Sequence, residues 1–173
     1  MNALSKVSVR YGVLAGVVGS ALLAGLYYMG RHPFLIPVFM DFRIILFGLF
    51  IFYTLREIKD YHQGGTLYFW QGIFASFLFA VCYAVISALA LLLFMQLAPG
   101  FLDAYINLST AQLKSLPPEV IDRIGKEVYD RNVKMLPATD SFDLVFLYFT
   151  QSLIISLFIS IILSVVLRKQ SKN

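Results

Sequence analysis

GGTLYFWQGIFASFLFAVCYAVISALALLLFMQL, residues 64–97, is the stretch that decides the fold. No Asp, Glu, Lys or Arg occurs between Asp60 and Asp103. The apolar run over 67–97 exceeds the ~20 residues that a helix needs to cross a bilayer, so it predicts a membrane span. Small residues recur in this run at every fourth position and give the helix a narrow strip that another helix can approach closely. The strip consists of Gly72, Ser76, Ala80, Ala84 and Ala88.

The composition of the whole chain agrees with a membrane protein. Of the 173 residues, 59% are hydrophobic and only 14% are charged, values far from those of ordinary soluble domains. Four apolar segments are long enough to cross a bilayer, at about 12–29, 34–55, 67–97 and 142–167. We therefore predict an all-α membrane protein with a single domain over 1–173. Its four transmembrane helices form an antiparallel bundle, with a helical extracytoplasmic segment over 99–140 between spans three and four.

Two further spans carry small residues at the same spacing of four. The first begins like a signal peptide, but its apolar run is long and lacks a convincing cleavage site, so we expect an uncleaved span. Its strip, Gly12, Gly16, Ser20 and Ala24, favours pairing with the strip of the third span. The fourth span carries Ser152, Ser156, Ser160 and Ser164. These hydroxyls can bond to carbonyls one turn earlier or bridge to a neighbouring helix; a polar path for a solute is the alternative.

Basic residues flank the spans and set the expected orientation. They lie before the first span, after the second and after the fourth: Lys6, Arg10, Arg56, Lys59, Arg168, Lys169 and Lys172. The positive-inside rule places these segments in the cytoplasm, with both termini inside. The segment between spans three and four also carries five basic residues, which weakens this contrast. The basic residues form no patch with interleaved aromatics, so the sequence predicts a lipid bilayer and not nucleic acid as the partner.

Asp41 and Arg43 are the ionisable residues closest to the interior of a predicted span. If the second span ends near Leu55, both lie in its outer half, where ionisable groups are expensive and suggest a function. Two residues apart on a helix, they point in different directions. The simpler interpretation is that Arg43 snorkels to the interface and Asp41 finds water or a basic neighbour.

The segment after Pro117 and Pro118 is predicted to form one solvated helix. It carries four acid-then-base pairs at a spacing of four, the favourable order on a helix: Glu119 with Arg123, Asp122 with Lys126, Glu127 with Arg131, and Asp130 with Lys134. Its other face carries Ile121, Ile124, Val128 and Met135. We expect this apolar face to pack on the rest of the outer segment; a docking surface for a partner is the alternative.

The turn between spans two and three resembles a known family. Residues 56–72, REIKDYHQGGTLYFWQG, combine a charged helix end, a Gly64-Gly65 turn that ends one helix, Thr66 as the expected cap of the next, and an aromatic entry into span three. This pattern and the last span ending in Arg168-Lys169 resemble small bacterial four-span membrane proteins catalogued as a domain of unknown function (DUF4199-like). The resemblance implies a four-span fold in a bacterial inner membrane and carries over no activity.

No set of residues in the sequence predicts catalysis, a metal site or a cofactor. The two histidines, His32 and His62, fall at opposite sides of the membrane in this topology, and no Walker-type loop or Ser, His and acid set occurs. We therefore expect a non-enzymatic structural or accessory subunit that contacts a membrane-protein partner or forms a homo-oligomer. The alternative is a small-solute or ion transport component that uses Asp41, Arg43 and the serine strip.

Overall fold

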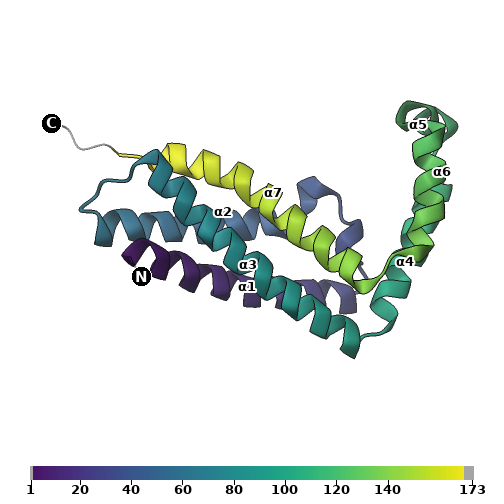
Figure 1. The fold of residues 1–173 in the computed structure, drawn as a ribbon, viewed down its shortest axis with the longest axis horizontal. Helices are drawn as coiled ribbons and strands as arrows, with labels where there is room; N and C mark the ends of the chain where they lie inside the picture. Colours follow the sequence, from purple (N-terminus) through teal and green to yellow (C-terminus); the bar gives the residue numbers. More distant parts are fainter. Residues whose placement is uncertain (1, 170–173) are drawn as a thin grey trace.

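The computed structural model describes residues 2–169 as an all-helical chain (Figure 1). Four long helices lie side by side: α1 (Ala3–Tyr28), α2 (Phe42–Glu57), α3 (Phe69–Leu97) and α7 (Ser141–Leu167). Three shorter helices form an arm that projects from one end: α4 (Gly100–Lys114), α5 (Pro118–Ile124) and α6 (Lys126–Met135). Within residues 2–169 the structure contains no β-strand, only an isolated bridge between Leu67 and Lys169.

Three of the long helices, α1, α3 and α7, are long and apolar enough to cross a membrane. The predicted second span, residues 34–55, has the wrong start, because α2 begins only at Phe42 and has 16 residues. The residues before α2 form two short 3-10 turns, Pro33–Leu35 and Val38–Met40. Because proline disfavours helical backbone at the residue before it, His32 and Ile36 are extended and interrupt any longer helix. At its other end α2 continues into a π-helical turn, Ile58–His62, and stops at Gly64, whose φ is +58°.

The turn into α3 differs from the prediction at its cap. Thr66 does not cap the helix; its hydroxyl donates to the carbonyl of Gln63 at 2.8 Å. The helix begins at Phe69, and the Gln71 side chain accepts a hydrogen bond from the backbone N–H of Tyr68 at 3.1 Å. The third span therefore starts two residues later than the predicted 67.

α3 is the central helix and packs against α1 on one side and α7 on the other. The predicted pairing of α1 with α3 is present, and the backbones come very close. A Cβ added at Gly12 would lie 2.7 Å from both the Phe79 carbonyl oxygen and the Cβ of Cys82, and one at Gly16 would lie 2.8 Å from Ile86. The glycines of α1 thus receive larger side chains of α3.

The small-residue strip of α3 faces α7 instead. A Cβ added at Gly72 would lie 2.7 Å from the hydroxyl oxygen of Ser164, and Ala80 lines the same groove as Ser156 and Ser160. The strip of the third span was predicted to pack against the strip of the first span. That prediction is wrong, because the strip packs against α7. The serines of α7 take the place expected for the glycines of α1.

The basic residues gather at one end of the bundle, opposite the arm. Arg10 of α1 forms an ion pair with Glu57 at the end of α2, at 2.6 Å, and Tyr11 donates to the same carboxylate at 2.9 Å. Leu67 and Lys169 exchange two backbone hydrogen bonds, so the end of α7 lies beside the start of α3. Both described chain ends and the turn before α3 therefore lie at this end of the bundle (Figure 1).

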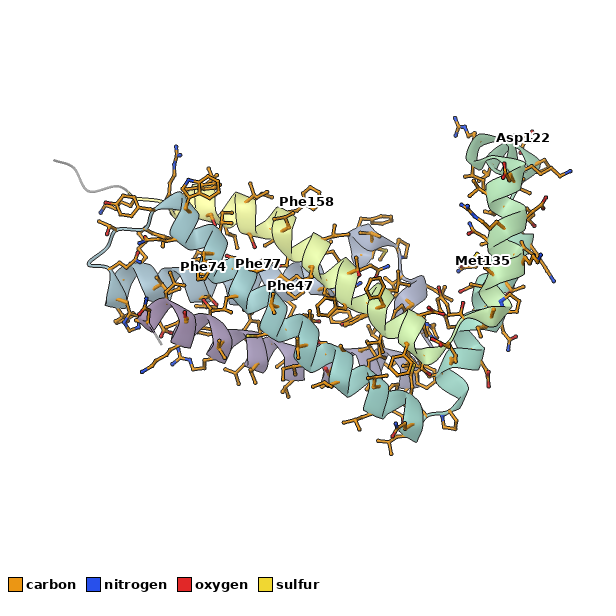
Figure 2. All side chains as sticks on the ribbon, in the orientation of Figure 1. Phe47, Phe74, Phe77, Asp122, Met135 and Phe158 are labelled. Atoms are coloured by element: carbon orange, nitrogen blue, oxygen red, sulfur yellow. The ribbon has the colours of Figure 1, made fainter. Side chains whose placement is uncertain are left out.

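The predicted single helix in the arm is wrong, because Gly125 divides it into α5 and α6 with φ +87°. None of the four predicted acid–base pairs comes within 4.0 Å among the described residues. The apolar face is not covered either. Ile124, Val128 and Met135 are 42%, 38% and 63% exposed; Met135, labelled on the arm in Figure 2, lines an open pocket with Tyr105 and Asp143.

Candidate functional site

The best-built polar cluster in the bundle is centred on Arg43. Asp41 is the N-cap of α2 and accepts a hydrogen bond from the backbone N–H of Arg43 at 2.9 Å. The Arg43 side chain folds back, so that Nε donates to the two carboxylate oxygens of Asp41 at 3.0 and 2.9 Å. The expectation of diverging side chains is wrong because Asp41 precedes the helix instead of lying within it.

Arg43 also reaches across to α7. Its Nη1 donates to the Ser152 hydroxyl at 3.0 Å, and its Nη2 donates to the Gln151 side-chain oxygen at 2.9 Å. The guanidinium lies 4.4 Å from the ring centroid of Tyr148, a cation–π contact. Arg43 is only 5% exposed, so the prediction that it snorkels to the interface is wrong. One buried cation fixes the start of α2 to the middle of α7.

Two tyrosines extend the cluster to α3. The hydroxyls of Tyr83 and Tyr148 lie 3.0 Å apart and share a hydrogen bond, and the edge of Phe47 packs on Tyr83 with ring centroids 4.6 Å apart. The sequence places Tyr148 only among the tyrosines expected at a membrane interface, and it does not single out Tyr83 or Gln151, because aromatic residues in an apolar run give no signal of their partners. Arg43, Tyr83 and Tyr148 thus connect three of the four long helices.

The space beside the cluster is small. A cavity of about 10 Å³ is bounded by Asp41, Arg43, Phe34 and Tyr148, together with Pro33 and Phe42. That volume holds about one water molecule. Transport through the cluster requires a water-filled route to Asp41, and the cavity in this conformation is too small for a hydrated solute. The geometry is that of a buried ion pair between Asp41 and Arg43 whose remaining hydrogen bonds connect α2 to α7.

The serines of α7 are all buried, and their bonds are mostly local. Ser152 donates to the Tyr148 carbonyl at 2.7 Å, and Ser160 donates to the Ser156 carbonyl at 2.6 Å. Such bonds satisfy the hydroxyl within its own helix. Only Ser152 also receives a bond from the cluster, from Arg43. The serine strip is therefore a packing surface against α3 with one polar contact, at the end nearer the arm.

The other predicted strip residues occupy similar positions. Gly12 and Gly16 are buried in α1, whereas Ser20 and Ala24 are half-buried; Ser20 donates to the Gly16 carbonyl at 2.7 Å. In α3 the first four strip residues, Gly72, Ser76, Ala80 and Ala84, are buried and Ala88 is half-buried.

A second cluster, which the sequence did not indicate, joins the arm to the bundle. His32 is 6% exposed, its Nε2 lies 3.1 Å from the Phe101 carbonyl oxygen, and its ring packs on Phe101 with centroids 4.5 Å apart. Tyr27, Phe34 and Tyr105 complete the aromatic surroundings. Burial lowers the pKa of the His32 imidazole below its usual value, although the hydrogen bond to Phe101 acts in the opposite direction. The ring holds α4 against the loop after α1.

No metal centre is apparent in the part of the chain that the structure describes, where no three His, Cys, Asp or Glu side chains converge. Comparison with known families identified a match. The model of a family described as "protein of unknown function (DUF4199)" matches residues 10–169. The chain belongs to this family. The DUF4199 match covers nearly all of the described structure and supplies no activity for the Arg43 cluster. Searches of the curated proteins and of the solved structures gave no significant match.

Proposed function

We propose that this DUF4199 protein is a structural or accessory subunit of a bacterial inner membrane and contacts its partner through the arm formed by α4–α6. The observation that carries the proposal is the exposed apolar face on α5 and α6. Ile124, Val128 and Met135 are exposed on an arm that contacts the bundle mainly through α4. A strongly charged helix pair that leaves apolar side chains in solvent is suited to a transient protein contact.

The proposal includes four spans. α2 begins beside α7, where Arg43 bonds Ser152, and its last residue, Glu57, pairs with Arg10 near the start of α1. It therefore runs from the depth of Ser152, in the middle of α7, to the basic end, and residues 29–41 complete the return from the end of α1. If α1, α3 and α7, the three helices that are long enough to cross a membrane, cross the bilayer, α2 crosses with them, and its residues Phe42–Leu55 are apolar apart from Arg43 and Thr54.

The proposed orientation in the membrane rests on the basic residues at the end of the bundle opposite the arm. Lys6, Arg56 and Arg168 lie at the end opposite the arm, and the positive-inside rule would place that end in the cytoplasm and the arm outside. A cysteine introduced at Ser115, in a Cys82→Ala background, should react with an impermeant maleimide in intact spheroplasts. One at Gln63 should react only after permeabilisation. The reverse pattern would overturn the orientation, and labelling of both sites from one side would overturn the four-span count.

Site-specific photocrosslinking tests the accessory role. A photoreactive residue at Val128 in native membranes should give a discrete crosslinked product, either a partner or a dimer of this chain. The matched control is the same residue at Asp130, which is exposed on the same helix but points away from the apolar face. Recovery of monomer alone at Val128, or the same products at both positions, would count against a docking face on the arm.

A further inference from the structure

An apolar groove runs between α3 and α7 on the outside of the bundle. Its volume is about 250 Å³, with Ala80, Ser156 and Ser160 among its lining residues and Phe77 and Leu157 beside them. Phe77 and Leu157 are more than half exposed, and Figure 2 shows Phe77 on the α3 side. The groove is therefore open to whatever surrounds the bundle in the plane of the membrane.

The dimensions of the groove suit a hydrocarbon chain better than a helix. Along α7 the lining runs from Leu153 to Ser160, which is about 10 Å at 1.5 Å per residue. A volume of 250 Å³ over that length gives a cross-section of roughly 25 Å², whereas one turn of a helix about 10 Å across already fills roughly 400 Å³. A helix of a second copy would rest on the rim of the groove and leave its floor empty.

Basic and aromatic side chains lie beyond one end of this groove. Arg168 and Lys169 follow α7, about 12 Å past Ser160 at the helical rise. On α3, Trp70 lies one turn before Ile73, which lines the groove, and its side chain is 76% exposed. Tryptophan at such a position is typical of the boundary between lipid chains and headgroups.

Arg168 and Lys169 differ from Arg10 and Arg56 at that end, and unlike Lys6 and Lys59 they follow a helix that lines the groove. Arg10 and Arg56 are already paired with Glu57 and Asp60. Within residues 2–169, by contrast, no carboxylate lies within 4.0 Å of Arg168 or Lys169. One leaflet, from headgroup to midplane, is about 20 Å deep. A lipid with its headgroup at these two residues would therefore place the inner part of its chain at the depth of the groove.

We propose that the groove between α3 and α7 binds an acyl chain of an anionic phospholipid whose headgroup lies at Arg168 and Lys169. The serine and alanine floor admits the chain because it carries no large side chain. Arg168 and Lys169, which have no carboxylate partner within the described residues, select the negative headgroup. This site lies on the bundle, so it is independent of the docking role proposed for the arm.

The single tryptophan of the chain, Trp70, reports on this site directly. The full chain is reconstituted in phosphatidylcholine vesicles, and its fluorescence is quenched by brominated phosphatidylglycerol or brominated phosphatidylcholine at equal mole fraction. We expect the anionic lipid to associate about fivefold more strongly for each basic residue it contacts. In Arg168→Gln/Lys169→Gln the preference should fall to near unity. Arg123→Gln/Lys126→Gln, with the same charge change on the arm, should keep it.

The acyl-chain part of the proposal has its own variants. Leu153→Phe/Leu157→Phe narrows the groove and should lower the preference for the anionic lipid, because the displaced part of the chain loses its van der Waals contacts with the groove walls. The control Val85→Phe/Leu89→Phe enlarges exposed residues of α3 outside the groove and should leave association unchanged.

Three results would overturn the proposal. Equal quenching by the two lipids would remove the headgroup site, and a preference that survives narrowing of the groove would remove the acyl-chain site. Protection of Trp70 from both lipids, together with crosslinking between copies at Leu157, would assign the groove to a second copy. None of these results depends on the crosslinks expected from the arm, so the two proposals fail separately.

Discussion

Replacing Asp41 by Asn tests whether the buried ion pair holds the bundle together. Asn keeps a side-chain oxygen for the N-cap of α2 but removes the negative charge beside Arg43. In the native cluster that carboxylate accepts from the backbone N–H at 2.9 Å and from Nε at 3.0 and 2.9 Å. Since Arg43 is only 5% exposed, water cannot replace the lost charge. Removing one partner of a buried pair typically costs about 3–5 kcal/mol.

The size of the destabilisation distinguishes the loss of hydrogen bonds from the loss of a charge partner. Hydrogen bonds in membrane proteins average only about 0.6 kcal/mol, so losing the two bonds that Nε and Nη2 of Arg43 donate to Oδ2 of Asp41 would cost about 1 kcal/mol without a charge effect. We expect about 3 kcal/mol for Asp41→Asn, because the uncompensated cation dominates. The free energy of unfolding is measured by titration with SDS in mixed micelles, followed by circular dichroism. The double variant Asp41→Asn/Arg43→Met should regain most of the loss, since it removes both charges. A loss below about 1 kcal/mol in Asp41→Asn would refute the reasoning, because it would equal ordinary hydrogen bonds alone.

Three further predictions use the same titration. Gly12→Ala places a Cβ 2.7 Å from a backbone oxygen of α3 and should cost about 1–3 kcal/mol, whereas Gly25→Ala, with no atom within 4 Å, should stabilise by up to about 1 kcal/mol. Tyr148→Phe removes the hydroxyl pair with Tyr83 and should cost about 1 kcal/mol; equal stability would show the pair to be dispensable. Because burial lowers the pKa of folded His32, the unfolded chain binds more protons below pH ~6.5. Stability should therefore be full well above that pH and fall as the pH is lowered from about 6.5 to 5.5, and His32→Phe should flatten this dependence.

The apolar cores of α1, α3 and α7 could be predicted because a long uncharged run is sufficient to specify a membrane helix. The start of α2 could not, because the residues before Phe42 are as apolar as those after it. Only Pro33 and Pro37 separate the two, and proline tolerates the first turn of a helix as well as a 3-10 turn. The break at Gly125 was missed for a related reason. The four acid–base pairs at a spacing of four favoured one continuous helix, and a single glycine did not argue strongly against it. Glycine, however, readily adopts the positive φ found at this position.

The Arg43 cluster shows where a spacing rule fails. The rule that residues two apart diverge holds inside a helix, and Asp41 lies just outside one. From the N-cap position its carboxylate can accept from the backbone and from the Arg43 side chain together. Asp or Asn before an apolar helical run is itself a capping signal, so Asp41 could have been identified as the cap. The partners on α7 could not, because they depend on how the helices pack.

The small-residue strips identify close helix contacts without identifying the partner. α3 has two buried faces, one lined by its strip and one carrying Phe79 and Tyr83. Both α1 and α7 bring a strip of their own, so the sequence alone allows either to meet the strip of α3. Volume decides between them: the glycines of α1 leave room for Phe79 and Tyr83, and a Cβ at Gly19 would fall within 3.0 Å of the Tyr83 ring. The serines of α7 leave less room, so they require the side of α3 where Gly72 lies. A strip of glycines on one helix can therefore receive either large or small side chains from the next helix. Which of these it receives depends on which face of the next helix carries the large side chains.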